Sequence, residues 1–482
     1  MPLARSLDEN LSELKRRLGV GVTFDVLVRE LSVGGRDAAL IFIDGLIKDT
    51  ATVHVMKFLM RLRREDLAPQ PIRKLLRSGL PYFEVDTVST LEEVVDQVLA
   101  GPAALLVDGC TDAVILDLRE YPVRGVEEPD LERVTRGSRE GLVETIVFNT
   151  ALIRRRLRDP NLRFEMRSVG QWSRTDVALG YIDGVANPDT VDKIRRRLEN
   201  VDVGALTMGA QSLIELLVGQ RLNPFPLARL TERPDVVAAH LAEGHVVVFV
   251  DTSPTAIILP ANVWHFTQHA EEYFQAPAVG TFMRWVRFLA IGLSLVLGPA
   301  WLAVATWETA PDWISFIGPA EKPRVALWLQ FLLLEFGLVL IGQALIHTPT
   351  AMSTALGIVG AILLGELAIT VRVFVPETVL YVAVAALMSF ATPSIEFAHA
   401  LRLFRYGLFV LVALWGWWGF GAGLAGTFLW LALTNSFGLP YLYPLLPFNG
   451  KALVRLLFRF PILQVGVRAT PKKSRKGAYP DS

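Results

Sequence analysis

Residues 288–307 read FLAIGLSLVLGPAWLAVATW, a run of 20 residues without a charged side chain. As a helix rising about 1.5 Å per residue, this run is long enough to cross a hydrocarbon core of about 30 Å. A helix buried in a soluble domain is rarely so long and so uniformly apolar. The run therefore predicts a helix that spans a membrane.

Four more apolar runs follow along the chain. Three of them contain one acidic residue each, and the last, of 28 residues, contains no charge. Five such runs in series exclude an ordinary soluble core and predict an α-helical multi-pass transmembrane domain over residues 281–440. The four further runs are residues 325–345, 351–371, 373–390 and 406–433.

Basic residues near the ends of the runs bear on orientation. Arg284 and Arg287 precede the first run, Arg402 and Arg405 precede the last, and residues 472–476 hold a basic cluster. Because Lys and Arg concentrate on the cytoplasmic side, all three places are expected there. A tail on the same side as the amino-terminal half requires an even number of crossings, whereas five runs are odd.

Two explanations of this conflict stay open. Either one of the short runs is re-entrant, or residues 441–461 contribute another element. That stretch places Lys451, Arg455 and Arg459 at intervals of four among apolar side chains. The pattern predicts an amphipathic helix on the membrane surface, followed by the basic tail, in a region of residues 441–482.

The charge balance excludes some classes of partner. The residues before Phe288 carry a net charge of −5 and the rest carry +5, so no basic face for nucleic acid is indicated. Cys110 is the one cysteine, which excludes an internal disulfide framework and fits a reducing compartment. The first 25 residues are polar and lack the apolar core of a signal peptide, so we expect this end not to be exported.

The charge-rich half contains two pairs of similar strings. DAALIFID at residues 37–44 matches DVALGYID at 176–183, and AALLVDGCTDAVIL at 103–116 matches VVVFVDTSPTAIIL at 246–259. The longer strings have the form of β-hairpins, with a polar turn between two apolar strands. Chance similarity of short strands is the alternative. The repetition predicts a soluble α/β half made of two duplicated subdomains.

We expect the first subdomain and a linking helix within residues 1–162, with that helix at about 139–158. The second subdomain is expected within residues 163–280. Each matched strand ends in an aspartate, and ligands favour the carboxyl ends of strands in open sheets. Ordinary turn chemistry, in which the Asp side chain accepts from nearby amides, is the stronger interpretation. The four residues are Asp44, Asp108, Asp183 and Asp251.

Other polar residues are candidates for a metal or phosphate site. His265, His269 and Glu272 could place two imidazoles on one helix face for a metal, although contacts beside the membrane explain them as well. The arginines of residues 154–158 could bind phosphate, but a solvated helix end that pairs with acids is favoured. No Walker loop, nucleophile elbow, zinc-protease motif or paired-cysteine motif is present. We therefore predict no enzyme activity, no cofactor and no metal.

Several longer strings carry a family resemblance. IRRRLRDPNLRFE at residues 153–165, SRTDVALGYIDGVANPDTV at 173–191 and TERPDVVAAHLAEGHVVVFVDTSPTAIILPA at 231–261 resemble the A subunits of spore germination proteins, the GerA family of endospore-forming bacteria. The resemblance extends from about residue 25 to 465. The receptors mostly carry Gly after the Asp of the hairpin turn, where this chain has Thr252. That departure favours an accessory branch and puts direct nutrient recognition in doubt.

The resemblance implies a protein of the inner spore membrane whose soluble half faces the core. Relatives are implied to assemble with other germination membrane proteins and to form oligomers in the lipid bilayer that release monovalent cations. We therefore expect a subunit of an oligomeric cation-release channel that acts in, or amplifies, the nutrient germination response. A non-conducting scaffold that organises other germination proteins is the alternative. A secondary transporter is weaker, because the runs show no inverted repeat.

The acids inside the apolar runs are the candidates for a pore. A charge at mid-bilayer costs about 2.5–3.5 kcal/mol on insertion scales, so it normally faces a cavity or a partner. Glu366 lies among small residues that allow close helix approach, Glu335 lies in mid-run, and Glu377 follows Pro376 at a predicted pore mouth. A structural role between helices is the alternative for each. The small residues beside Glu366 are Gly357, Gly360 and Gly365.

Overall fold

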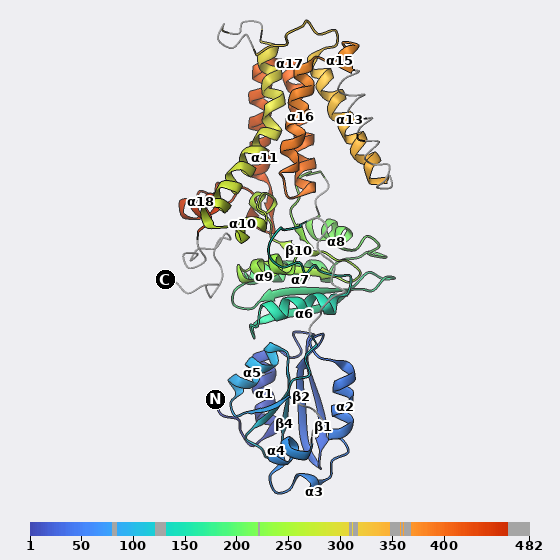
Figure 1. Ribbon diagram of the computed structural model, residues 1–482, viewed down its shortest axis with the longest axis vertical. Helices are drawn as coiled ribbons and strands as arrows, with labels where there is room; N and C mark the ends of the chain where they lie inside the picture. Colours follow the sequence, from blue (N-terminus) through green and yellow to red (C-terminus); the bar gives the residue numbers. More distant parts are fainter. Residues whose placement is uncertain are drawn as a thin grey trace.

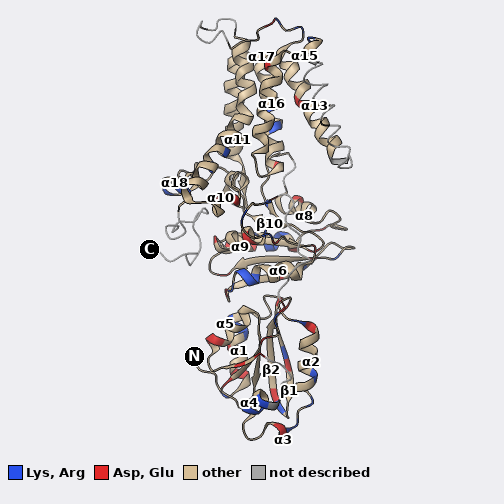
Figure 2. Ribbon diagram, in the orientation of Figure 1, with Lys and Arg blue, Asp and Glu red and all other residues tan. Residues whose placement is uncertain are grey.

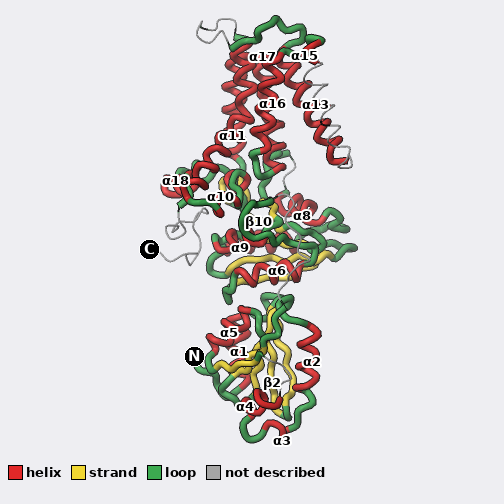
Figure 3. Tube along the Cα trace, in the orientation of Figure 1, coloured by secondary structure: helices red, strands yellow, loops and turns green. Residues whose placement is uncertain are grey.

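The computed structural model describes residues 1–79, 84–120, 132–219, 222–307, 311, 317–347, 357, 360 and 368–460. Figure 1 shows an elongated molecule with two α/β units at one end and a bundle of long helices at the other. Charged residues are dense in the α/β units and sparse in the helical bundle (Figure 2). The fold class expected from the sequence, an α/β half followed by a helical half, is confirmed (Figure 3).

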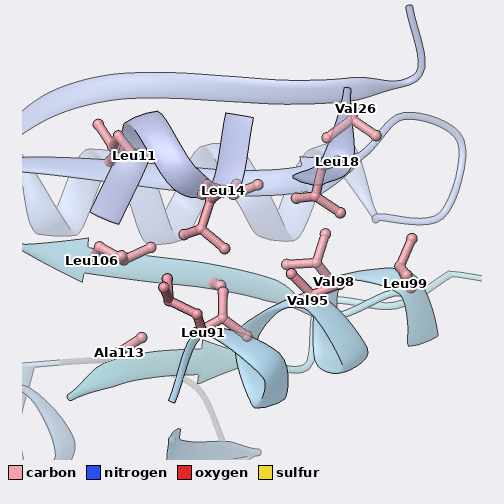
Figure 4. Packing of buried hydrophobic residues seen from close by; sticks show 14 of the residues in the cluster. Leu11, Leu14, Leu18, Val26, Leu91, Val95, Val98, Leu99, Leu106 and Ala113 are labelled. Carbon is pink, nitrogen blue, oxygen red and sulfur yellow. The ribbon is translucent and has the colours of Figure 1, made fainter. Parts of the chain in front are cut away.

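The first α/β unit is built on a five-stranded antiparallel sheet in the order β1-β2-β4-β5-β3. Helices α1 and α5 pack on one face, where leucines of α1 and leucines and valines of α5 contact the sheet (Figure 4). Helix α2 covers the other face. The elements are α1 (Leu7–Leu18), β1 (Val26–Val33), β2 (Arg36–Ile43), α2 (Asp49–Leu59), α3 (Arg64–Leu67), α4 (Pro71–Lys74), a π-helical turn (Leu75–Gly79), β3 (Val85–Val88), α5 (Leu91–Ala100), β4 (Ala103–Val107) and β5 (Ala113–Leu116).

Helix α1 shows how the sequence sets a local element. Its buried leucines recur at helical spacing, so one face meets the sheet while the other faces water. The Ser6 side chain accepts a hydrogen bond from the amide of Glu9 and caps the start of the helix. Gly19, at φ 71°, ends the helix in the left-handed conformation that glycine adopts without a steric penalty.

The second α/β unit repeats the first. Its five strands follow the order β6-β7-β9-β10-β8, which is the same topology. The elements are α6 (Ile146–Arg156), β6 (Leu162–Val169), β7 (Thr175–Ile182), α7 (Pro188–Glu199), α8 (Gly209–Val218), β8 (Arg229–Thr231), α9 (Pro234–Ala242), β9 (Val246–Val250), β10 (Ala256–Leu259), a 3-10 turn (Val263–Phe266) and α10 (Glu271–Phe274). Both predicted hairpins are present, as β4-β5 and β9-β10.

Side-chain hydrogen bonds repeat along with the strands. Asn10 exchanges two hydrogen bonds with the backbone of Ala4, and Asn149 does the same with Val143. These bonds fix the approach to α1 and α6, which are therefore equivalent helices. The helix expected at residues 139–158 is shorter than predicted and packs within the second unit against α9. The duplication read from the sequence is confirmed.

A buried ion pair joins the two units. Arg154 of α6 donates to the carboxylate of Asp25, with 2.9 Å between Nε and Oδ2, and both side chains are 1% exposed. Phe24 donates its amide to the carbonyl of Phe164, which connects the entry of β1 to β6. The interface is thus made by the backbone as well as by charge.

The helical domain contains three described helices that are long and apolar enough to cross a membrane. They are Pro277–Ala305, Leu327–Leu345 and Ile395–Leu433. The full helices are α11 (Pro277–Ala305), α13 (Leu327–His347), α15 (Ala368–Thr370), α16 (Pro376–Phe390) and α17 (Ile395–Leu433).

Helix α17 is a hairpin and not one straight helix. Gly416 leaves the helical conformation, with φ 53° and ψ −131°. Beyond it the chain folds back, so that the rings of Phe404 and Trp430 lie 5.9 Å apart. The prediction of a single crossing at residues 406–433 is therefore wrong. The physical reason is that glycine tolerates a positive φ that other residues rarely adopt.

Because of the hairpin, the run at residues 406–433 passes through the helical domain twice, not once. Helix α11 begins beside the α/β units, and Trp307, just past its far end, contacts Trp417 at the turn of α17. The second leg of α17 returns to the α/β units, where Asn223 donates to Thr434 and accepts from Trp430. The chain thus enters and leaves the helical domain on the same side. The conflict between five runs and a cytoplasmic tail is removed for this reason.

The run at residues 351–371 lies largely outside the described residues. The described helices on either side of it are α13 and α15. Residues 434–457 then return to the α/β units as β11 (Asn435–Ser436), β12 (Leu439–Pro440) and α18 (Gly450–Leu457). The amphipathic helix expected within residues 441–461 is present but shorter than predicted.

Candidate functional site: an ion-pair network in the helical domain

Three helices meet at one buried carboxylate. Glu335 of α13 accepts from Arg405 of α17, with 2.7 Å between Nη2 and Oε1 and 2.8 Å to Oε2. The other terminal nitrogen of Arg405 donates to the carbonyl of Ser294 in α11, at 2.5 Å. Both charged side chains are 2% exposed. One guanidinium therefore links α11, α13 and α17.

The pairing stabilises two buried charges, each of which would be unfavourable without the other. A lone charge in an apolar interior is strongly unfavourable, whereas a paired and hydrogen-bonded charge is tolerated. A second arginine, Arg402, places its Nε 3.9 Å from the same carboxylate. The network thus contains two cations and one anion. Among the described residues, the Nε atoms of both arginines and the hydroxyl of Tyr406 lack a hydrogen-bond partner.

This geometry revises the reading of two sequence features. Arg405 was expected at the membrane edge before the last run. Its side chain is instead buried between the helices, where it pairs with Glu335. Glu335 was a pore candidate with an inter-helix role as the alternative. Its carboxylate makes the inter-helix contact in this chain, and a pore-lining role stays a prediction.

The other pore candidates are distributed as follows. Glu377, in the first turn of α16, accepts from the amide of Ala320 at 2.9 Å, and its second oxygen has no partner among the described residues. A Cβ added to Gly360 would lie 2.6 Å from Cδ1 of Ile341 in α13, whereas one added to Gly357 would meet nothing within 4 Å. Glu366 and Gly365 lie outside the described residues.

A second buried network joins the helical domain to the α/β units. Glu272 of α10 is fully buried and accepts from Arg284, at 2.6 Å, and from Arg287. Arg284 also donates to the carbonyls of Arg455 and Leu456, at the end of α18. The two arginines expected on the cytoplasmic side of the first run are therefore used to fix the start of α11.

His265 does not share a helix with His269, because the 3-10 turn ends at Phe266 before α10 begins. Instead, its ring lies 5.3 Å from that of His240 and 5.0 Å from that of His245. Burial lowers the pKa of all three imidazoles, that of His245 to about 4, so they are neutral near pH 7. In the described part of the chain no group of three or more suitable side chains could hold a metal ion.

Three of the four strand-end aspartates accept hydrogen bonds from backbone amides. Asp108 accepts from the amide of Leu7 at the start of α1, and Asp251 accepts from the amide of Ile146 at the start of α6. Asp44 accepts from the next amide in its turn. Turn and cap chemistry therefore accounts for these three residues.

The arginine run divides between two roles. Arg155 and Arg156 pair with Glu140, as the preferred interpretation expected. Arg154 differs, because it is buried against Asp25 and is not solvated.

Sequence reasoning missed His240, His245 and the partner of Glu335. The histidines come from separate segments whose packing is not visible in any local pattern. The available signal was Arg405, which directly precedes the uncharged run at residues 406–433, because an arginine at the edge of a membrane-spanning segment often has a partner there.

Comparisons with known proteins identify the family. The family model described as Bacillus/Clostridium GerA spore germination protein matches residues 12–470. This chain belongs to the GerA family. The observation agrees with the strings that carried the resemblance, and it extends over both α/β units and the helical domain.

Relatives within the GerA family cover nearly all of the chain. Stage V sporulation protein AF of Bacillus subtilis (strain 168) is 44% identical, over 94% of this chain and 92% of that protein. Spore germination protein KA of the same organism is 30% identical, over 95% and 85%. The crystal structure of the N-terminal domain of the A subunit of the Bacillus megaterium spore germinant receptor GerK3 matches with 28% identity and a TM-score of 0.42, covering 54% of this chain and 96% of that one.

Proposed function

We propose that this GerA-family chain is a subunit of an oligomeric cation-release channel in the inner spore membrane. Its α/β units would lie on the core side, and it would act in, or amplify, the nutrient germination response together with other germination membrane proteins. Membership of a family of spore germination proteins supports the setting of this proposal.

The acids of the apolar runs support the ion-conducting part. Glu335 already has a cationic partner in Arg405, which leaves Glu366 as the stronger candidate for a pore. The close approach of Gly360 to Ile341 is the observation that carries the proposal, because it places one glycine of the run that contains Glu366 beside α13. In an oligomer, one carboxylate per subunit would form a ring that attracts monovalent cations.

The test is K⁺ efflux from liposomes that contain the purified chain, with and without membrane proteins that co-purify with it. Glu366→Gln should lower the flux or change its selectivity among monovalent cations. Glu321→Gln is the matched control, because the Glu321 side chain is 69% exposed outside the apolar helices. Flux that is unchanged by Glu366→Gln would remove this residue from the pore. No flux in any condition, with the oligomer intact, would favour the non-conducting scaffold.

A further inference from the structure

An exposed apolar surface lies where the helical domain meets the α/β units. It is formed by the first turns of α11, by α18 and by the loop before α18. Trp285 of α11 and Phe458 at the end of α18 contact each other with ring centroids 5.1 Å apart, so the surface is continuous across both helices. Its exposed members are Phe282, Trp285, Phe448, Val454 and Phe458, of which Phe448 is 72% exposed. A contiguous exposed apolar patch usually marks a contact with a partner or a membrane.

This surface is held rigidly. The indole nitrogen of Trp285 donates to the carbonyl of Leu457 at 2.8 Å, and the amide of Arg459 donates to the hydroxyl of Thr281 at 3.0 Å. Arg284, which is buried, donates to the carbonyl of Leu456 at 2.7 Å. Because α18 and the segment directly after it are bonded to α11 at three places, the position of α18 relative to α11 is fixed.

Basic side chains accompany the apolar ones. Lys451 and Arg455 are one helical turn apart on α18, and residues 441–460 contain no acidic side chain. A hollow of about 420 Å³ is lined by Gly450, Lys451, Val454, Arg455 and Phe460. The hollow thus combines two cationic side chains with apolar walls.

The depth of this surface decides its occupant. It lies beside residues 277–287 of α11, directly before the uncharged run that begins at Phe288. At this level a membrane-spanning helix passes the lipid headgroups, where tryptophan and amphipathic helices concentrate. We propose that α18 and the first turns of α11 form an anchor on the membrane surface that binds anionic phospholipid headgroups through Lys451 and Arg455. The anchor is independent of whether the chain conducts ions.

The test measures, by native mass spectrometry, how tightly the full-length chain in detergent binds two lipids. Dioctanoyl phosphatidylglycerol and dioctanoyl phosphatidylcholine are titrated separately. We expect the chain to bind phosphatidylglycerol more tightly than phosphatidylcholine. In the variant K451Q/R455Q the affinity for phosphatidylglycerol should fall roughly fivefold for each charge removed. The matched control is K57Q/R61Q, which removes an exposed pair of basic residues with the same spacing on and just after α2 of the first α/β unit.

Two further arms keep the proposal falsifiable. The swap K451R/R455K preserves the charges and should retain phosphatidylglycerol binding, with monodispersity and melting temperature confirming the fold of every variant. Equal retention of the two lipids, binding unchanged in K451Q/R455Q, or an equal loss in K57Q/R61Q would overturn the proposal. Displacement of the lipid by an equal concentration of inorganic phosphate would show a phosphate site and overturn the assignment to a lipid surface.

Discussion

Arg405 and Glu335 form a salt bridge of 2.7 Å between α17 and α13, and each side chain is 2% exposed. The arginine also donates to the carbonyl of Ser294, so the pair ties three helices that are far apart in the sequence. Loss of one partner would leave the other charge buried and uncompensated, which is the costly situation for a charge in an apolar interior.

Single substitutions of this pair should therefore destabilise the chain. We expect Glu335→Gln and Arg405→Gln each to cost about 3–5 kcal/mol, and the double substitution to cost less than their sum. Thermal unfolding of the full chain in detergent measures the effect. Glu321→Gln, at an exposed position, should leave the melting temperature unchanged. Additive losses in the double variant would contradict a direct pairing.

The hairpin in α17 can be tested by cross-linking. A Cβ added to Gly423 would lie 2.4 Å from Cδ2 of Leu408, so the variant L408C/G423C in a C110S background should form an intramolecular disulfide. In a straight helix the same positions would be about 22 Å apart and could not be bridged. Mass spectrometry after mild oxidation gives the result. The pair L408C/L433C should stay reduced, and an unbridged L408C/G423C would count against the hairpin.

The three packed histidines make stability depend on pH. Burial lowers the pKa of His245 to about 4, against about 6.5 for a free imidazole. Between about pH 4 and 6.5 the unfolded chain therefore binds more protons than the folded chain. Stability should therefore be complete above about pH 6.5 and fall toward pH 4, with roughly 3 kcal/mol attributable to His245. The lowered pKa values of His240 and His265 add in the same direction.

Apparent melting temperatures between pH 7.5 and 4.5 measure this dependence. His245→Gln should flatten the profile, because a group that does not titrate contributes no proton linkage. His54→Gln, at an exposed position on α2, serves as the control and should leave the profile as it is. A profile that keeps its slope in His245→Gln would assign the acid sensitivity to other groups.

The turn between β9 and β10 holds a strained residue. Thr252 adopts φ 68°, and its counterpart in the first unit, Gly109, adopts φ 79°. Their amides make matching bonds, to the carbonyls of Glu144 and Arg5, each at 2.8 Å. A β-branched residue at positive φ is unfavourable, so Thr252→Gly should stabilise the chain by about 0.5–1 kcal/mol after the entropy of glycine is subtracted.

The converse substitution provides the comparison for this prediction. Gly109→Thr should destabilise the chain by about 0.5–1 kcal/mol, because the strain that it introduces into the first unit exceeds the entropy cost of glycine that it removes. Melting temperatures of the two variants should move in opposite directions. A loss of stability in Thr252→Gly would mean that the threonine side chain makes a favourable contact that outweighs the backbone strain.

Much of the architecture could be predicted from the sequence, because it depends on local properties. The uncharged run at residues 288–307 indicates a spanning helix by length and composition alone. The two α/β units were predicted because their strands repeat at nearly constant offsets, and their matching sheet orders confirm this. The candidate site was predicted less well. Glu335 was found as an acid in an apolar run, but its pairing with Arg405 was not.

The sequence by itself determined the class of protein, the duplication and the positions of most apolar helices, since hydrophobicity and strand pattern are properties of short segments. Only the tertiary structure decided which glycine of the last run turns the chain, because Gly416 has the same local context as several other glycines nearby. It also decided the partners of Glu335, Glu272 and His265. Those contacts join residues 12 to 70 positions apart, and packing between elements selects them.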